Sequence, residues 1–148
     1  MLFERRGASF ATGVVPFRDG GEPCHFRSGP RIHVQVLPGH LTLPVLAMVD
    51  TAAPWCIFEP AISEALRDHV DVLREGIAID SRLGSFRGTL CQGRLQIVAE
   101  DGEDLNIEAL MFLCPDWPGG NFIGYEGFLD RIRFAVDPHR NRFYFSSL

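Results

Sequence analysis

The sequence lacks several features that would place it in common functional classes. In 148 residues, no apolar run approaches the roughly 20 residues that a membrane-spanning helix requires. There is no block of Lys and Arg, and the formal net charge is −5, so we expect neither a nucleic acid nor a membrane as partner. Residues 1–11 carry Glu4, Arg5 and Arg6 with no apolar segment behind them. This does not fit a secretory signal, and we expect a cytoplasmic protein.

Paired cysteine spacing is also missing. Cys24, Cys56, Cys91 and Cys114 are scattered along the chain without a Cys-x-x-Cys unit, and the neighbouring Cys24 and His25 do not make a set of metal ligands. A zinc site needs several ligands that converge. We therefore expect no metal and no cofactor, and cysteines that pack as small hydrophobic residues.

The residues that are present describe one globular domain. Apolar residues make up 46% of the chain and charged residues 22%, which is typical of a soluble protein. The length suits one hydrophobic core and is too short for two domains. We predict a single domain over 1–148, in which 1–30 form an N-terminal extension of one short strand and an exposed loop.

Hydrophobic periodicity predicts mostly β-structure. Ile32, Val34 and Val36 alternate with polar residues, which indicates a half-buried strand that turns at Pro38 and Gly39 and returns over 41–49. Pro at a first helical position, followed by apolar residues at spacings of three and four, predicts a helix over 60–69. Together with the closely spaced turns, these elements favour a closed, mostly β domain with one or two short helices. The remaining predicted elements are strands over 11–17, 55–58, 105–113, 132–136 and 142–145, a turn at 101–102 and a short helix over 126–131.

One stretch stands out because an apolar strand runs directly into a carboxylate. The run over 43–49 has no polar face, as in a strand buried on both sides, and it ends at Asp50. A charge at the end of a buried strand must be hydrogen-bonded, paired or put to use, because uncompensated loss of water is costly. Thr51, Ala52 and Ala53 supply a hydroxyl group and closely approaching backbone for this purpose.

The stretch resembles the active-site turn of the aspartic peptidases, whose usual wording is Asp-Thr-Gly-Ala or Asp-Ser-Gly. Here it reads Asp-Thr-Ala-Ala over 50–53. About seventy residues later, Asn121-Phe122-Ile123-Gly124 and the residues up to Ile132 resemble the segment and short helix beneath that turn in the retropepsin-like members. The resemblance implies a closed, acid-protease-like (retropepsin) barrel of a single lobe that forms a homodimer.

A second element of the family is a mobile hairpin. Residues 76–98 read as a long hairpin, and retropepsin-like proteins carry in this position a flap that closes over bound peptide. The resemblance places the flap tip near 84–88, with Phe86 touching substrate. The alternative is an ordinary turn that contains glycine.

The chemistry that the resemblance implies requires two aspartates, which share one proton because like charges about 3 Å apart cannot both ionise. This chain offers one such unit, because Asp80-Ser81-Arg82 has Arg where the motif requires a small residue. A working site would therefore need Asp50 from two copies of the chain. The implied catalytic residues are Asp50, Thr51 and Ala52, and the implied substrate-binding residues are Ala53, Pro54, Gly84, Phe86, Gly88, Ile123 and Gly124.

The sequence departs from the family pattern at two positions. Ala52 stands where Gly is usual, which costs little if φ is negative and about 1 kcal/mol or more if φ is positive. Tyr125 stands where many viral members carry an Arg or Asp that braces the dimer. The C-terminal strand, with Phe143 and Phe145 on one face, either pairs across the two-fold axis or belongs to the core of one chain.

Three functions fit these features. The first is a dimeric aspartic endopeptidase that hydrolyses peptide bonds of extended or unfolded polypeptide. The second keeps the fold and the dimer without hydrolysis, as a peptide-binding or dimerisation module. The third is an unrelated small β-barrel in which Asp50 only caps backbone N–H groups at the end of a strand.

Overall fold

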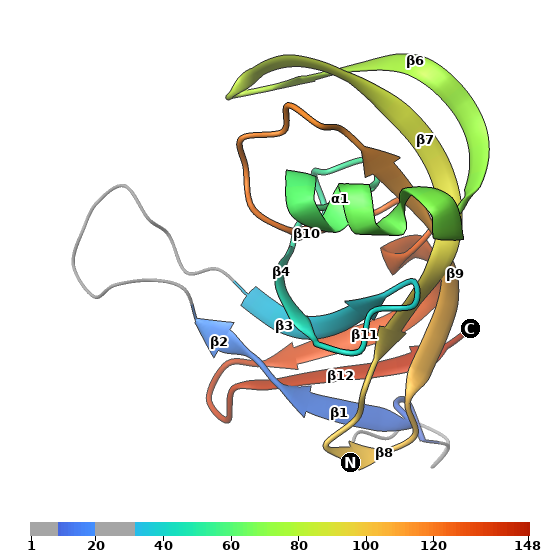
Figure 1. Cartoon of the computed structure of the whole chain (residues 1–148). Helices are drawn as coiled ribbons and strands as arrows, with labels where there is room; N and C mark the ends of the chain where they lie inside the picture. Colours follow the sequence, from blue (N-terminus) through green and yellow to red (C-terminus); the bar gives the residue numbers. More distant parts are fainter. Residues whose placement is uncertain (1–8, 20–31) are drawn as a thin grey trace.

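The computed structural model describes residues 9–19 and 32–148 (Figure 1). Most of the predicted N-terminal extension, including Cys24, lies outside the described residues. The described helical segments are α1 (Pro60–Leu66), η1 (Arg67–His69) and η2 (Leu129–Arg131). The described strands are β1 (Gly13–Pro16), β2 (Arg18–Asp19), β3 (Ile32–Pro38), β4 (Val45–Val49), β5 (Cys56–Ile57), β6 (Asp71–Ser81), β7 (Gly84–Ile97), β8 (Asp101–Gly102), β9 (Leu105–Leu113), β10 (Phe122–Ile123), β11 (Ile132–Asp137) and β12 (Arg142–Ser147).

Six strands close into a barrel in the order β3-β4-β10-β5-β9-β7. The ring closes because the end of β3 pairs with β7, with Leu37 opposite Gln96 and Pro38 opposite Leu95. The predicted hairpin of β3 and β4 is present, with Gly39 at φ 59° in its turn. Such a φ favours glycine. The prediction of a closed, mostly β barrel is confirmed.

A second sheet lies at the end of the barrel away from the β6–β7 hairpin and has the order β11-β12-β1-β8 (Figure 1). The C-terminal strand β12 is paired on both edges within its own chain, with Val15 of β1 opposite Phe143 and Phe134 of β11 opposite Phe145. Phe143 and Phe145 are fully buried. The C-terminal strand therefore belongs to the core of its own chain, which was one of the two roles predicted for it; the other was pairing across a two-fold axis.

The main core fills the space between the barrel and the second sheet. Its side chains come from nine of the twelve described strands, in which alternate residues point inward, and β2, β6 and β8 contribute none. Leu66 of α1 joins it and is fully buried. We call this set the main core: Val15, Phe17, Val34, Val36, Ala47, Cys56, Phe58, Leu66, Cys91, Leu95, Ile97, Leu105, Ala109, Met111, Leu113, Ile123, Phe128, Leu129, Ile132, Phe143 and Phe145.

The two predicted helices have different outcomes. The helix predicted over 60–69 is confirmed, as α1 followed directly by η1. The helix predicted over 126–131 is wrong in extent, because only η2 is helical. Gly127 has φ 81°, a left-handed conformation that cannot lie inside a right-handed helix, and its N–H donates to Oδ1 of Asp130 (2.8 Å).

The β6–β7 hairpin arches over α1 and over the loop between β9 and β10 (Figure 1). The strand β6 begins at Asp71, five residues before the predicted start of the hairpin at 76. Most of its residues are exposed, and its pairing with β7 is irregular between Val72 and Ile77. An exposed strand without strict alternation carries little periodic signal, which explains the missed residues.

Candidate active site

Asp50 lies at the end of a strand that is held from both sides. The strand β4 pairs antiparallel with β3 and parallel with β10. The N–H of Asp50 donates to the carbonyl oxygen of Ile123 (3.0 Å), and the N–H of Met48 donates to that of Asn121 (2.8 Å). The backbone that carries the carboxylate is therefore fixed by two neighbouring strands.

The turn after β4 folds back on the carboxylate. The N–H of Ala52 donates to Oδ1 of Asp50 (2.9 Å), and the N–H of Ala53 donates to the carbonyl oxygen of Asp50 (3.2 Å). Side chains of Asp commonly close such turns by accepting a backbone N–H two residues on. Asp50 is half-buried, whereas Thr51 and Ala52 are exposed. The carboxylate is thus held at a surface of the single chain.

Ala52 fits this turn without backbone strain. Among the described residues other than glycine, Asn141 alone has a positive φ, so φ of Ala52 is negative. An alanine with negative φ adopts an ordinary conformation and restricts the unfolded chain more than glycine does. Ala in place of the usual Gly at position 52 therefore costs little conformational free energy, as expected for a residue with negative φ.

The segment that begins at Asn121 supports the turn from below. The N–H of Tyr125 donates to the carbonyl oxygen of Ala53 (2.8 Å), and the N–H of Glu126 donates to that of Pro54 (2.8 Å). Gly124 lies directly against the backbone of Trp55, where an added Cβ would be 2.2 Å from the carbonyl oxygen. A side chain at position 124 would therefore push the two segments apart.

Asn121 ties three elements together, a role that the sequence did not reveal. Its Nδ2 donates to the carbonyl oxygen of Leu46 in β4 (3.2 Å), and its Oδ1 accepts the N–H of Glu59 just before α1 (2.9 Å). Its own carbonyl accepts from Met48 of the same strand β4. An Asn before a short apolar run is too common for this role to be predicted from sequence.

Cys56 lies beneath the turn and belongs to the main core. Burial raises the pKa of its thiol to about 12, and a hydrogen bond with the backbone of Gly124 offsets a small part of that rise. A thiol with so high a pKa stays protonated and is a poor nucleophile. Cys56 therefore packs as a small hydrophobic residue, as the sequence predicted for the cysteines.

The tip of the β6–β7 hairpin is not where the sequence placed it. Ser81 pairs with Gly84, so Arg82 and Leu83 form a two-residue turn ahead of the predicted tip at 84–88. Oγ of Ser81 accepts the N–H of Leu83 (3.1 Å) and donates to the carbonyl oxygen of Gly84 (3.2 Å). Gly88 lies within β7, where an added Cβ would be 2.4 Å from the carbonyl oxygen of Leu113. Glycine at position 88 therefore allows β7 to approach the end of β9 closely, and it does not form part of a turn.

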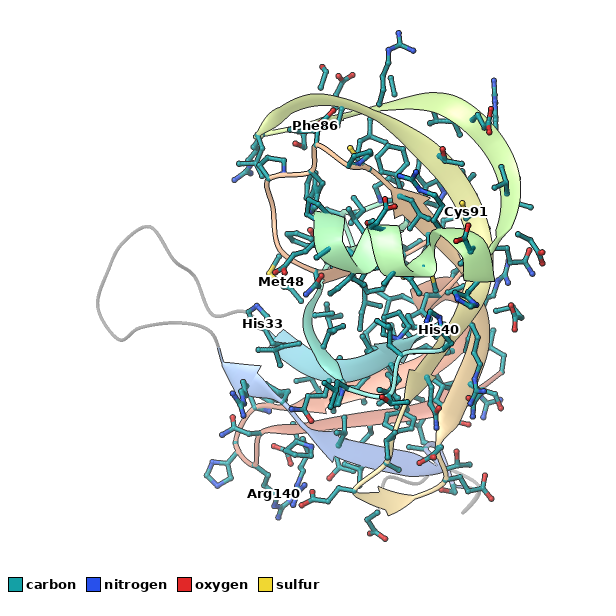
Figure 2. All side chains as sticks on the ribbon, in the orientation of Figure 1. His33, His40, Met48, Phe86, Cys91 and Arg140 are labelled. Atoms are coloured by element: carbon teal, nitrogen blue, oxygen red, sulfur yellow. The ribbon has the colours of Figure 1, made fainter. Side chains whose placement is uncertain are left out.

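A second group of hydrophobic side chains joins the hairpin to the rest of the chain. We call it the hairpin cluster: Ile57, Phe112, Cys114 and Trp117, which are buried, and Trp55, Ile77, Ile79, Phe86 and Phe122, which are partly buried. Phe86 lies near the hairpin tip, well separated in the view from Met48, which lies on the strand β4 that leads to Asp50 (Figure 2). Its ring meets that of Trp117 edge-on (centroids 5.3 Å apart), and Trp117 meets Phe122 in the same way (5.8 Å).

Ile123 has a different position from the one predicted. It was expected to line a substrate cleft, but its side chain is fully buried in the main core. The reason is the alternation of β10, in which Phe122 faces the hairpin cluster and Ile123 faces the opposite side. Ile123 therefore supports the site from within and offers no surface to a ligand.

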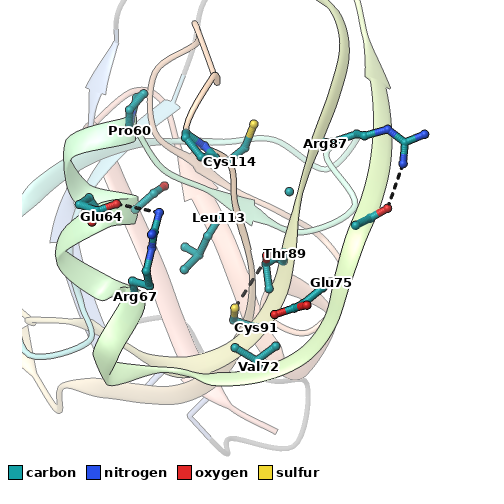
Figure 3. Close-up of a pocket in the computed structure, with 14 residues that line it drawn as sticks. Pro60, Glu64, Arg67, Val72, Glu75, Arg87, Thr89, Cys91, Leu113 and Cys114 are labelled. Carbon is teal, nitrogen blue, oxygen red and sulfur yellow. Dashed lines mark hydrogen bonds and ion pairs between the residues drawn. The ribbon is translucent and has the colours of Figure 1, made fainter.

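A cavity of about 470 Å³ lies between α1, the base of the hairpin and the end of β9 (Figure 3). Glu64 and Arg67 form an ion pair at its edge (2.8 Å), and Arg87 donates to the carbonyl oxygen of Gly76 (3.3 Å). Its lining does not include Asp50, Thr51 or Ala52. Of the predicted site residues, it contains Gly88. The cavity and the carboxylate turn are separate features of the molecule.

Asp80 does not supply a second carboxylate to the turn. It lies in β6 of the hairpin, where it accepts a hydrogen bond from Oγ of Ser85. Within the part of the chain that the structure describes, no three His, Cys, Asp or Glu side chains converge as a metal site. No helix among the described residues is long and apolar enough to cross a membrane.

Comparisons with known proteins point to one fold. No family model matches the sequence, and the search of curated proteins finds no match. Among solved structures, the chain is similar to the retroviral protease-like domain of Ddi1 from Leishmania major, with 20% identity, 80% of this chain and 90% of that chain covered, and a TM-score of 0.53. A retropepsin-like aspartic protease from Rickettsia conorii shares 13% identity, with 91% of each chain covered and a TM-score of 0.46. The chain has a retropepsin-like fold.

Proposed function

We propose that the protein is an aspartic endopeptidase whose active site forms between two copies of the chain. The observation that supports this most is the placement of Asp50 at an exposed turn, on a strand fixed from both sides, within a retropepsin-like fold. One chain offers one such carboxylate. The second aspartate that this chemistry requires would be Asp50 of the other copy.

In the proposed dimer the two carboxyl groups share one proton, because both cannot be ionised at close distance. The ionised Asp50 takes a proton from a water molecule, which attacks the peptide carbonyl carbon. The protonated Asp50 hydrogen-bonds the carbonyl oxygen and stabilises the developing negative charge. The N–H of Ala52 holds the carboxylate in place, and the hydroxyl of Thr51 contacts the backbone of the other copy.

The surface around Asp50 suits contact with a second copy. Thr51, Ala52 and Pro54 are exposed there, and Tyr125, whose N–H is bonded to Ala53, is 51% exposed. An aromatic side chain at such a site is typical of the centre of an interface. The strand β12 uses both edges within its own chain, so the proposed interface does not need the C-terminal strand.

The substrate would lie extended between the turn and the hairpin. We propose that Ala53 and Pro54 contact it from one side, and that Gly84 and Phe86 contact it from the other. Gly124 acts by letting its segment approach the turn, as its contact with Trp55 indicates. A location in the cytoplasm remains a prediction from the sequence.

The test is cleavage of an unfolded protein by the native chain and by Asp50→Asn over a series of pH values. We expect the variant to remain folded and dimeric and to lose activity roughly a hundredfold or more, since a positioned acid–base group contributes at least that much. The native rate should pass through a maximum with pH, because only the singly protonated pair is active.

The matched control is Asp68→Asn, which removes an exposed carboxylate of η1. It should cleave as the native chain does. If neither the native chain nor the control cleaves while both are dimeric, the result favours the peptide-binding module. A monomer without activity at any concentration would favour the view that Asp50 only caps the turn.

A further inference from the structure

The indole N–H of Trp55 is buried and has no hydrogen-bond partner in the described part of the chain. The residue follows the Asp50 turn directly, and its backbone packs on Gly124. The chain has two tryptophans, and the other one differs in this respect. Nε1 of Trp117 donates to the carbonyl oxygen of Gly120 (2.9 Å). Buried side-chain donors are nearly always paired, so the N–H of Trp55 requires an explanation.

The surroundings of Trp55 are apolar and include the hairpin. Its ring stacks on that of Phe112, with centroids 6.0 Å apart and planes at 25°. Ile77, Ile79 and Phe86 of the hairpin belong to the same hydrophobic cluster. These three side chains are only partly buried, and the hairpin strand β6 is mostly exposed. A hairpin held by so few buried contacts can lift at little cost, and lifting it would uncover the cluster.

We infer that the N–H of Trp55 binds an uncharged carbonyl oxygen of the peptide substrate when the peptide enters beneath the hairpin. This rests on the proposed function, since it assumes that a peptide occupies the site beside Asp50. The N–H is desolvated before the peptide arrives, so a hydrogen bond formed there is not offset by loss of bound water. Trp55 is thus a residue that contacts the peptide, and it determines specificity if the carbonyl oxygen belongs to a side chain.

The chemistry of the hairpin cluster selects the kind of acceptor. The hydrophobic side chains that pack with Trp55 are aliphatic, aromatic or cysteine, and Arg87, next to Phe86 in β7, donates to the carbonyl oxygen of Gly76 (3.3 Å). A carboxylate buried there would lose its water and gain one neutral donor, which does not compensate. Side chains of Lys and Arg have no acceptor to offer. The carbonyl oxygen belongs either to the peptide backbone or to a Gln or Asn side chain.

The experiment uses the Asp50→Asn variant, which the proposed function expects to bind peptide without cleaving it, and compares it with the same protein carrying Trp55→Phe. We expect the second protein to bind a Gln-containing extended peptide roughly tenfold more weakly, the loss typical of one hydrogen bond. In NMR spectra of the first protein, the indole proton resonance of Trp55 should move downfield on binding. A peptide with Met in place of Gln separates the two sources: loss of the shift indicates the side chain, and its persistence indicates the backbone.

Trp117→Phe is the matched control, because it removes an indole N–H that is already paired. Both variants lose packing, but Trp117→Phe should lower the melting temperature more than Trp55→Phe does, because it alone also breaks a hydrogen bond. Equal peptide affinity with and without Trp55→Phe, together with an unmoved indole resonance, would overturn the inference while cleavage by the native chain still supported the peptidase. Absence of both peptide binding and native cleavage would overturn the proposed function and the inference with it.

Discussion

The two hydrophobic clusters of this molecule differ in how completely they are buried. Phe128, Phe143 and Phe145 of the main core have no exposed surface. In the hairpin cluster, five of the nine members are only partly buried, and they come from the hairpin, the segment that follows the Asp50 turn, and β10. We therefore expect the main core to supply most of the stability of the fold, and the hairpin cluster to open without global unfolding.

The strand β5 shows how the two clusters meet. Cys56 faces the main core and its neighbour Ile57 faces the hairpin cluster, because side chains alternate along a strand. Gly124 packs against Trp55 just before β5. The Asp50 turn thus lies at the boundary between a fully buried cluster and a partly buried one, which would suit the proposed site.

The largest difference between the clusters should appear on truncating a phenylalanine in the main core. We expect Phe145→Ala to lower the free energy of unfolding by about 3–5 kcal/mol, the usual cost of a large cavity in a packed core. Phe145 is fully buried and packs closely on Gly13. Urea denaturation followed by circular dichroism measures the change. A loss of less than about 1 kcal/mol would contradict the assignment of the stable core.

A smaller effect is expected from the thiol at the boundary. The pKa of Cys56 is raised to about 12 in the folded protein, from an ordinary value of 9.0. The folded state therefore binds the proton more tightly. The contribution of the protonated Cys56 thiol to the free energy of unfolding is complete below pH 9. It is lost as the pH rises from 9 to 12, by up to about 1.4 kcal/mol per pH unit.

Comparing the pH dependence of unfolding in the native chain and in Cys56→Ala tests this. The variant should have the shallower slope in the alkaline range. Cys91, whose pKa burial also raises, is present in both proteins and cancels from the comparison. Identical slopes would show that the thiol is not sealed within the main core.

The smallest loss of stability is expected from the same kind of truncation in the hairpin cluster. Phe86→Ala removes the edge-on contact with Trp117, and we expect a cost of about 1 kcal/mol. Amide hydrogen exchange should quicken along β6 and the tip of β7, with little change in β12. If exchange quickened equally in β12, the two clusters would form one cooperative unit and the comparison would fail.

Local patterns in the sequence predicted much of the fold. Alternation at Ile32, Val34 and Val36 predicted β3, and the turn at Gly39 led to β4. Proline and apolar spacing predicted the helix over 60–69. The apolar run that ends at Asp50 predicted a strand buried on both sides. The strand β4 does lie between β3 and β10, but Ala47 is its only buried residue and Leu46 is exposed, so the predicted burial is wrong. Each of these features depends on residues that are close in sequence.

Features that depend on distant residues escaped prediction. The bonds of Asn121 to Leu46 and Glu59 join positions about sixty to seventy-five residues apart. Trp117 lies in a loop without periodic pattern, so its place between Phe86 and Phe122 had no local signal. The turn at the hairpin tip was missed because glycine at 84 ends the turn instead of forming its centre. The predicted roles of Asp50, Thr51 and Ala52 remain predictions.

The pairing of β12 on both edges has a consequence for control of the proposed enzyme. Because β12 already has both neighbours within its own chain, the proposed dimer would not need this strand from the other copy, and each subunit could fold before it associates. Dilution would then release intact subunits that are inactive because each holds half of the catalytic pair. Well below the dissociation constant, activity would rise with the square of the chain concentration, as mass action requires. The amount of protein in its compartment would itself act as the switch.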